Sequence, residues 1–282
     1  MSREMLTLDL GCDRTIRLLA EGAGEPIVLI HGAIATHADW LEAPFAAFAR
    51  LGRVIAVDRP GHGQSRRPRH AAAPREQAAQ IRAALRAIGA ERCSLVGHSF
   101  GGLVALAYAA AFPAEVERLL LIAPIARPEP RPMEHLLFGP RAAPWSGPFV
   151  AEAAGALDPL VLPLIHRAMF WPQTPPDGWL ERYPYGEVLS RAHTVEEGED
   201  SLTLLPHNAE GWVDLSRVTA PAAIIAGSRD LVADPDRHAR PLARRLGAPL
   251  EIVEGVGHMV HHVAFDRVLQ QFVTLSSCLT KA

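Results

Sequence analysis

A serine set between two glycines is the residue of this sequence best suited to covalent chemistry. Ser99 lies in the segment G-H-S-F-G at 97–101, where the apolar strand pattern Cys93–Val96 runs directly into an alanine-rich helical pattern. A sharp turn from strand to helix exposes a serine hydroxyl, and the two glycines remove side chains that would collide as strand and helix approach. Ser99 is therefore the predicted nucleophile.

A serine hydroxyl attacks a carbonyl only when a base takes its proton. The sequence has 13 histidines, so position must select among them. When the nucleophile occupies such a turn, the acid and the base follow it in the order Ser, Asp or Glu, His. His258 follows the last strand pattern, Leu250–Val253, and is the predicted base. His261 and His262 are alternatives that are better explained as residues of the helix that starts there.

The acid is expected after the preceding strand pattern, Ala222–Ala226. Asp230 follows this pattern within four residues and is the predicted acid, which would fix the tautomer of His258 and stabilise its imidazolium form. Asp234 and Asp236 come later and are predicted to cap the next helix.

Two backbone N–H groups must stabilise the oxyanion. One belongs to Phe100, the residue after the nucleophile, and lies at a helix N-terminus, where the dipole favours negative charge. The other is expected from the loop after the strand pattern Pro26–Ile30, where Ala33 is the predicted donor. His31 in the same loop is interpreted as a structural residue. This machinery needs neither a metal nor a cofactor, and none is predicted.

Several short segments resemble, in order along the chain, the successive signatures of the α/β-hydrolase superfamily. They are H-G at 31–32 with Trp40, D-R-P-G-H-G-Q-S at 58–65, G-H-S-F-G-G at 97–102, G-S-R-D at 227–230 and G-H at 257–258. The resemblance implies the fold, the Ser-His-Asp triad and a capped, esterase-like branch, but says little about the substrate. The segment 58–65 is similar to the turn that follows the family's fourth strand and is interpreted as structural. The stretch Met169–Gln173 is similar to lid segments of bacterial members.

Alternating strand and helix patterns predict an α/β fold that positions these residues. We expect an about eight-stranded, mostly parallel sheet flanked by helices, with an antiparallel start. The strand patterns are Met5–Leu10, Thr15–Ala20, Pro26–Ile30, Val54–Val57, Cys93–Val96, Leu119–Ile122, Ala222–Ala226 and Leu250–Val253. The helical patterns are Asp39–Leu51, Arg75–Ile88, Phe100–Phe112, Asp236–Leu246 and His258–Leu275.

One region lacks any strand pattern and is predicted to be a helical cap inserted between strands 6 and 7. It spans 124–208, leaving 1–123 and 209–282 as the core domain, and its prolines exclude one long helix. Phe149–Leu157 and Leu160–Phe170 are possible short helices. The acidic run Glu196–Asp200 and the basic run Arg66–Arg69 are interpreted as solvated loops. The cap is expected to close an apolar pocket, whose predicted substrate-binding residues are Ile34, Phe138, Trp145, Met169, Phe170, Trp171 and Met259.

Composition limits the other possibilities. A chain of 282 residues can form one large core with a lid. A net charge of −3 favours neither a nucleic acid nor an anionic membrane as partner. With no signal-like apolar stretch and no long apolar run, no membrane span is predicted and the cytoplasm is the expected location. The three cysteines lack a disulfide or zinc spacing, and the excess of arginine over lysine favours a bacterial origin.

The predicted function is hydrolysis of small to medium, mostly apolar carboxylic esters through an acyl-enzyme. Two alternatives use the same triad: a carbon–carbon bond hydrolase acting on vinylogous diketones, which often has Asn where this chain has His98, and an acyltransferase. A non-catalytic small-molecule receptor on the same fold is a third alternative. Haloalkane dehalogenases and epoxide hydrolases have Asp in place of Ser99 and are disfavoured. The sequence leaves the substrate and the oligomeric state open.

Overall fold

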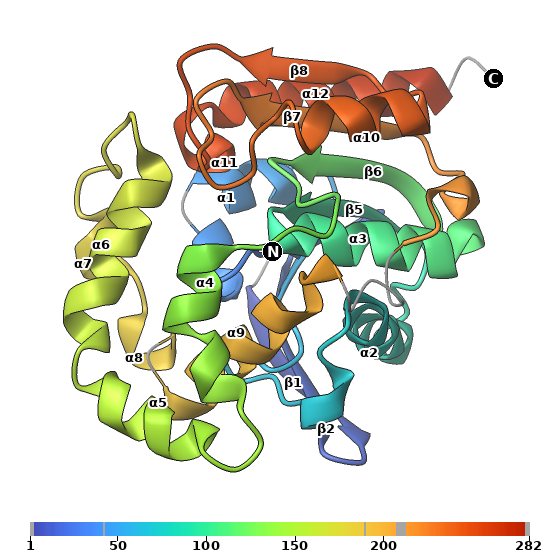
Figure 1. Cartoon of the computed structure of the whole chain (residues 1–282). Helices are drawn as coiled ribbons and strands as arrows, with labels where there is room; N and C mark the ends of the chain where they lie inside the picture. Colours follow the sequence, from blue (N-terminus) through green and yellow to red (C-terminus); the bar gives the residue numbers. More distant parts are fainter. Residues whose placement is uncertain (1–2, 42, 189, 207–212, 280–282) are drawn as a thin grey trace.

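The computed structural model of this chain describes residues 3–41, 43–188, 190–206 and 213–279. Its centre is an eight-stranded sheet with the strand order β1-β2-β4-β3-β5-β6-β7-β8 (Figure 1). The strands are β1 Glu4–Gly11, β2 Arg14–Glu21, β3 Pro26–Ile30, β4 Arg53–Val57, β5 Cys93–His98, β6 Val116–Ile122, β7 Ala222–Gly227 and β8 Leu250–Val253.

The sheet is mixed, and the predicted fold class is confirmed. β1 pairs with β2 and β2 with β4 in antiparallel fashion, whereas every pairing from β4 through β8 is parallel. Parallel strands connected by crossover helices are covered on both faces and become continuously apolar. β5, in the middle of the parallel part, shows this, because all six of its residues are buried. The carboxyl end of this central strand carries the nucleophile turn.

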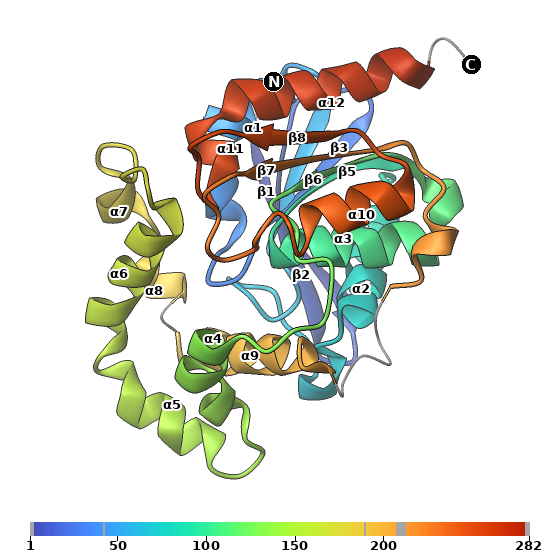
Figure 2. The same ribbon diagram turned by 45° about the horizontal axis from the view of Figure 1, so that its top comes forward.

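Helices cover both faces of the sheet. On one face α2 (Pro74–Ala87), α3 (Phe100–Ala111) and α10 (Ala239–Leu246) pack over a large apolar cluster, and on the other α1 (Ala43–Ala49) and α12 (Phe265–Leu279) cover a second one (Figures 1 and 2). On the second face the Phe48 and Phe272 rings meet edge to face, with centroids 5.1 Å apart. Because both clusters are closed, the sheet is a rigid base for the loops at its edge.

Two predicted helices are broken in the structure. The pattern Asp39–Leu51 divides into a 3₁₀ turn, η1 His37–Trp40, and α1. The pattern His258–Leu275 divides into α11 Val260–Val263 and α12, because Ala264 between them has a non-helical backbone, and His258 lies in the preceding loop. Apolar periodicity continued across both breaks, so the pattern could not locate them.

A helical insertion lies between β6 and β7, as predicted, and contains all the helices from α4 to α9. In Figure 2 it forms a separate layer beside the sheet. Its helices are α4 Pro132–Leu137, α5 Gly147–Gly155, α6 Asp158–Phe170, α7 Trp179–Arg182, α8 Tyr185–Val188 and α9 Arg191–Thr203, with the 3₁₀ turn η4 Gly139–Ala142 after α4. We call this insertion the cap. Among the described residues no single helix is long and apolar enough to cross a membrane, and only α5 and α6 together, bent by 85°, meet the length and composition criteria.

The acidic run Glu196–Asp200 is not a solvated loop, and that interpretation was wrong. It forms part of α9, and Glu197, Glu199 and Asp200 are buried against the core. The basic run is also corrected in part, because Arg67 is buried and pairs with two of these carboxylates. Each run looks like a solvated surface by itself, but each neutralises the other across the boundary between cap and core.

Candidate active site

Ser99 occupies the strained turn that the sequence predicts. Its backbone lies at φ 53° and ψ −119°, between the last residue of β5 and the first residue of α3. A non-glycine residue at positive φ is rare and persists where the surrounding structure enforces it. Here the enforcement includes Gly101, where a Cβ atom would lie 2.3 Å from the carbonyl oxygens of both Ile30 and His31. The glycine lets the loop after β3 approach the nucleophile turn closely.

The predicted acid and base meet across the ends of β7 and β8. His258 Nδ1 lies 2.8 Å from Asp230 Oδ2, and both side chains are buried. The other carboxylate oxygen, Asp230 Oδ1, accepts the backbone N–H groups of Val232 and Ala233, each at 2.8 Å. These bonds fix the carboxylate, which in turn fixes the imidazole with its proton on Nδ1.

The second nitrogen of the base is the one available for proton transfer. His258 Nε2 is buried and makes no hydrogen bond with the described part of the chain. With the proton on Nδ1, Nε2 carries the lone pair that can accept the proton of an attacking hydroxyl. Ser99 is also buried, and the structure shows no hydrogen bond between the two side chains among the described residues. Such catalytic contacts are often long before substrate binds.

The predicted oxyanion donors lie on either side of the nucleophile turn. Phe100 is the first residue of α3, where a backbone N–H has no partner inside the helix. The Ala33 N–H makes no hydrogen bond with any described residue. Its neighbour Ile34 lies at φ 53°, an outlier for a β-branched residue that costs on the order of 1–3 kcal/mol. The loop after β3 is therefore strained one residue beyond the predicted donor.

A histidine cluster that the sequence analysis did not foresee lies beside the triad. Asp39 accepts from His261 Nε2 and His262 Nε2, each at 2.9 Å, and the His98 ring lies 4.7 Å from the His258 ring and 4.1 Å from the His261 ring. Burial lowers the pKa of His261 to about 4. Burial and the neighbouring imidazoles lower the pKa of His98 well below its usual value. This cluster ties the 3₁₀ turn after β3 to the segment that follows His258.

His31 has a structural position, as the sequence interpretation suggested. Its Nδ1 lies 2.8 Å from the Gly32 carbonyl oxygen, and its Nε2 accepts the Arg59 backbone N–H at 2.9 Å. Burial, with the positive charge of Arg59, lowers its pKa well below the usual value. His31 therefore joins the loop after β3 to the turn after β4 as a neutral ring.

The cap residues predicted to bind substrate lie in different environments. Phe138 is buried and lines a small pocket with Ala33, Ile34 and Phe100, the pocket being completed by Glu134, Glu197, Asp200, Ser201 and Leu204. Phe170 and Met259 are buried in a cluster that joins cap and core, and Met169 packs against it. Trp171 is 47% exposed and Trp145 is 90% exposed. Neither tryptophan lines this pocket, so their contact with substrate stays a prediction.

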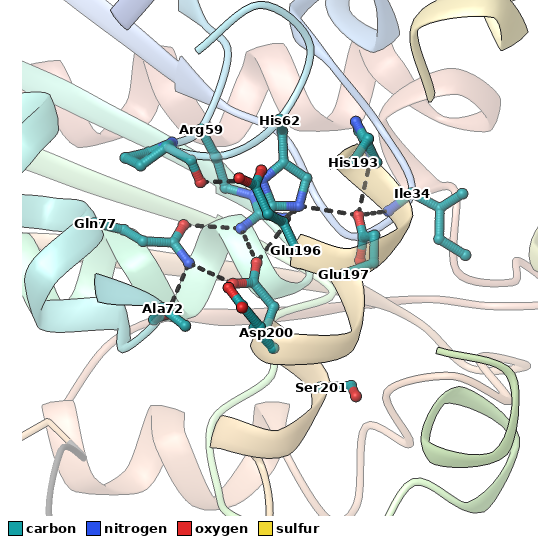
Figure 3. Close-up of polar contacts among 12 residues, drawn as sticks. Ile34, Arg59, His62, Ala72, Gln77, His193, Glu196, Glu197, Asp200 and Ser201 are labelled. Carbon is teal, nitrogen blue, oxygen red and sulfur yellow. Dashed lines mark hydrogen bonds and ion pairs between the residues drawn. The ribbon is translucent and has the colours of Figure 1, made fainter. Parts of the chain in front are cut away.

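Helix α9 docks on the turn after β4 through buried charges, which Figure 3 shows in close-up. Arg59 Nη1 lies 2.6 Å from Asp200 Oδ2, and Arg67 Nη1 lies 2.7 Å from Glu199 Oε2. Gln77 of α2 donates to Asp200 and accepts from Arg59. The turn at 58–65 thus receives the cap in addition to shaping the core. The sequence contains an acidic run, Glu196–Asp200, and a basic run, Arg66–Arg69, but the two are far apart in the chain and no local pattern indicates that they meet.

Two groups of buried side chains have ligand atoms close enough to hold a metal ion. Asp39, His98 and His261 form one, and His62, His193 and Glu197 form the other, each with ligand atoms within 4.8 Å of one another. In the second group Arg59 Nη2 lies 3.0 Å from His62 Nε2, and its positive charge opposes a cation there. In the first, both oxygens of Asp39 already accept imidazole hydrogen bonds. Neither group contains Ser99, Asp230 or His258.

The sequence is similar to one family of proteins and to several known proteins. The family model described as "Alpha/beta hydrolase family" matches residues 27–271. An uncharacterised protein of Mycobacterium tuberculosis is 32% identical, over 89% of this chain and 76% of that protein. The 2-hydroxy-6-oxo-2,4-heptadienoate hydrolase of Pseudomonas putida is 39% identical, but over only 36% of this chain and 38% of that enzyme.

Solved structures share the fold at low sequence identity. A thermophilic esterase from Thermogutta terrifontis superposes with a TM-score of 0.71 at 19% identity, covering 100% of this chain and 99% of the esterase. The epoxide hydrolase CorEH gives a TM-score of 0.71 at 20% identity, covering 99% of this chain and 100% of that one. At such identities the likeness concerns the fold alone. Taken with the family match over most of the sequence, it shows that the chain belongs to the alpha/beta hydrolase family.

Proposed function

We propose that this protein is a serine hydrolase that cleaves carboxylic esters of small to medium, mostly apolar substrates through an acyl-enzyme. The observation that carries the proposal is the buried contact of 2.8 Å between His258 Nδ1 and Asp230 Oδ2, which leaves Nε2 free of hydrogen bonds with the described residues. Family members that open epoxides or cleave carbon–halogen bonds use an Asp nucleophile, and this chain has Ser99 instead.

The reaction follows from the arrangement of these groups. Ser99 Oγ attacks the ester carbonyl while His258 Nε2 takes its proton. The N–H groups of Phe100 and Ala33 stabilise the oxyanion, and the tetrahedral intermediate collapses as His258 returns the proton to the leaving alcohol. Water then attacks the acyl-enzyme with His258 again acting as base, which releases the acid and restores Ser99. Asp230 keeps the imidazole oriented throughout.

The substrate's acyl or alcohol group is proposed to contact the pocket next to the oxyanion donors. Phe138, Ile34 and Phe100 provide apolar surface there, and Leu204 adds to it. The carboxylates of the same pocket are held by cationic partners, such as Arg59 and Arg67 at Asp200. This lining supports a mostly apolar substrate. The pocket has a volume of about 10 Å³, room for about one water molecule, so a substrate enters it only when the cap side chains move.

A panel of p-nitrophenyl esters of graded acyl length tests the proposal. We expect turnover of at least one ester and covalent labelling of Ser99 by a fluorophosphonate. Addition of an alcohol to the same assay measures acyl transfer, because a transferase would form a new ester in place of the acid. Labelling without turnover of any ester would instead indicate a receptor or an enzyme for another bond.

A carbon–carbon bond hydrolase is the second candidate. It is supported by the 39% identity with the heptadienoate hydrolase over 105 residues. Such an enzyme uses the same triad on a vinylogous diketone. Loss of the substrate's long-wavelength absorbance on incubation with the protein, with the ester panel run alongside, distinguishes the two.

A further inference from the structure

The cap holds one residue of the oxyanion loop from both sides. Ile34 follows Ala33, the proposed oxyanion donor, and its backbone is at φ 53°, a conformation that β-branched residues avoid. Its N–H donates to Glu197 Oε1 of α9. Its carbonyl oxygen accepts from His166 Nε2 of α6 and from the Tyr183 hydroxyl after α7, both at 3.0 Å. Three separate cap segments therefore meet at one residue of the core.

These contacts are buried and well oriented. Glu197, His166 and Tyr183 are each less than 9% exposed. The Ile34 carbonyl oxygen can only accept, so the proton of the neutral His166 ring is on Nε2, and Nδ1 accepts from the Tyr185 hydroxyl at 3.1 Å. Water does not readily reach these buried groups. Removing one partner therefore leaves the other without a hydrogen bond, which costs free energy.

Glu197 lies against two buried histidines. Its Oε1 lies 3.0 Å from His62 Nε2 and 3.4 Å from His193 Nε2, as Figure 3 shows. His193 Nδ1 accepts the Gly63 N–H at 3.3 Å, so the proton of that ring is on Nε2, which lies near Glu197 without making a hydrogen bond with the described residues. Burial alone would raise the pKa of Glu197, but the neighbouring imidazoles outweigh it and hold the pKa well below the usual range. The side chain is an anion with a fixed direction.

The position of Ile34 controls the position of Ala33. The Ile34 N–H belongs to the peptide unit that it shares with Ala33, so the bond to Glu197 fixes that plane. A relaxed Ile34 would move toward negative φ, and a rotation of this plane would reach the Ala33 N–H, in the preceding peptide unit, through the φ and ψ angles of Ala33. An oxyanion donor must lie within hydrogen-bond distance of the developing charge, so such a rotation weakens catalysis more than binding.

We propose that Glu197 is a positioning residue for the oxyanion hole, acting with His166 and Tyr183 on Ile34, so that docking of the cap completes the catalytic site. This inference depends on the proposed serine-hydrolase function, because it assigns Ala33 the role of oxyanion donor. Glu197 acts through Ile34 and needs no contact with the reacting atoms.

The test compares two buried carboxylates on the same helix. Glu197→Leu removes the acceptor of the Ile34 N–H, whereas Glu199→Leu removes the partner of Arg67 and Arg69 and leaves Ile34 untouched. Both variants lose a buried cap carboxylate that contacts the core, so their melting temperatures provide the match for loss of docking. Glu197→Gln keeps an acceptor oxygen and serves as the rescue. kcat and KM for p-nitrophenyl acetate and the rate of Ser99 phosphonylation are measured for each.

We expect Glu197→Leu to lower kcat by roughly 10- to 100-fold with little change in KM, below the loss seen when an oxyanion donor is removed outright. Glu197→Gln should recover most of that loss, and Glu199→Leu should keep kcat near that of the unmodified protein. Equal losses in kcat for the two leucine variants, at equal melting temperatures, would overturn the inference.

A second pair of variants covers the case in which Glu197→Leu does not fold. Glycine adopts positive φ without strain, so in an Ile34→Gly background the change Tyr183→Phe should matter less than in the native background. Tyr108→Phe, whose hydroxyl contacts Glu115 far from the site, is the control for Tyr183→Phe. Additive effects in this cycle would contradict the inference. If the unmodified protein is not labelled at Ser99, the proposed function fails instead.

Discussion

Arg59 of the core and Asp200 of the cap form a fully buried ion pair, with Nη1 and Oδ2 2.6 Å apart. The pair sits in a network where Arg67 and Gln77 also bind Asp200. Taking charges out of water costs free energy, and only close geometry and additional hydrogen bonds repay it. Such an arrangement specifies one orientation of α9 on the core, and hence one position of the cap over the active site.

Removal of Asp200 should destabilise the protein strongly, because Arg59 is then left buried without its partner. For Asp200→Ala we expect a loss of about 3–5 kcal/mol in the free energy of unfolding. Asp236→Ala, which breaks the exposed i,i+4 pair with Arg240, should cost less than about 1 kcal/mol. Urea denaturation of both variants measures the difference. Similar small losses in both would show that the buried pair adds nothing beyond a surface contact.

Ser99→Ala should abolish fluorophosphonate labelling and reduce ester turnover by several orders of magnitude. The reason is that no other hydroxyl follows β5 at the strained turn that faces α3. Mass spectrometry of the labelled protein, with kcat measured in parallel, checks this. Undiminished labelling of the variant would identify a different nucleophile.

The three triad residues should differ in the size of their effects. His258→Ala should be about as damaging as Ser99→Ala, because the two act as one unit. Asp230→Asn should be somewhat less damaging, since the base survives in a poorer orientation. Asp234→Asn is the matched control, because its carboxylate caps the Asp236 N–H and does not contact His258. A large loss of kcat in the control with none in Asp230→Asn would mean that the acid is misassigned.

Phe138 and Trp145 allow a comparison between a cap residue that lines the pocket and a cap residue that is exposed to solvent. Phe138 is buried in the pocket beside Ala33 and Phe100, whereas Trp145 is 90% exposed. Phe138→Ala should shift the acyl-length preference by about 1–3 kcal/mol in kcat/KM between esters, and Trp145→Ala should shift it less. The graded ester panel measures both. An unchanged profile in Phe138→Ala would place substrate elsewhere.

Glu196 should make the protein less stable as the pH rises. Partial burial raises its pKa to about 8, and Arg67 opposes the shift only in part. The unfolded chain has an ordinary glutamate pKa near ~4.3. Between these values the folded state keeps a proton that the unfolded state has lost, so stability present at low pH is lost as the pH rises through 8.

Glu196→Gln should remove this dependence. Its melting temperature should exceed that of the unmodified protein at pH above the Glu196 pKa of about 8, and the gain should shrink toward acidic pH. Thermal unfolding across this range, with the exposed Glu254→Gln as control, measures the difference. A gain that does not vary with pH would contradict the raised pKa.

The sequence alone determined the elements whose signals are local. The apolar strand Cys93–Val96, the glycines at 97 and 101 and the alanine-rich helix after them predict the nucleophile turn, because strand, turn and helix are adjacent in the chain. The order of Asp230 and His258 after their strands follows from the parallel sheet, whose carboxyl ends share one edge. The insertion between β6 and β7 was visible as a proline-rich stretch without strands.

Only the tertiary structure decided what the charged runs do. Glu196–Asp200 and Arg66–Arg69 are more than 125 residues apart, and nothing in either run indicates burial. Their side chains can leave water only because each neutralises the other, and that depends on how α9 is placed on the turn after β4. The same holds for Ile34, whose positive φ depends on Glu197, His166 and Tyr183 from distant parts of the cap. Long-range polar contacts leave no periodicity in a sequence, because the partners are matched in space and not in spacing.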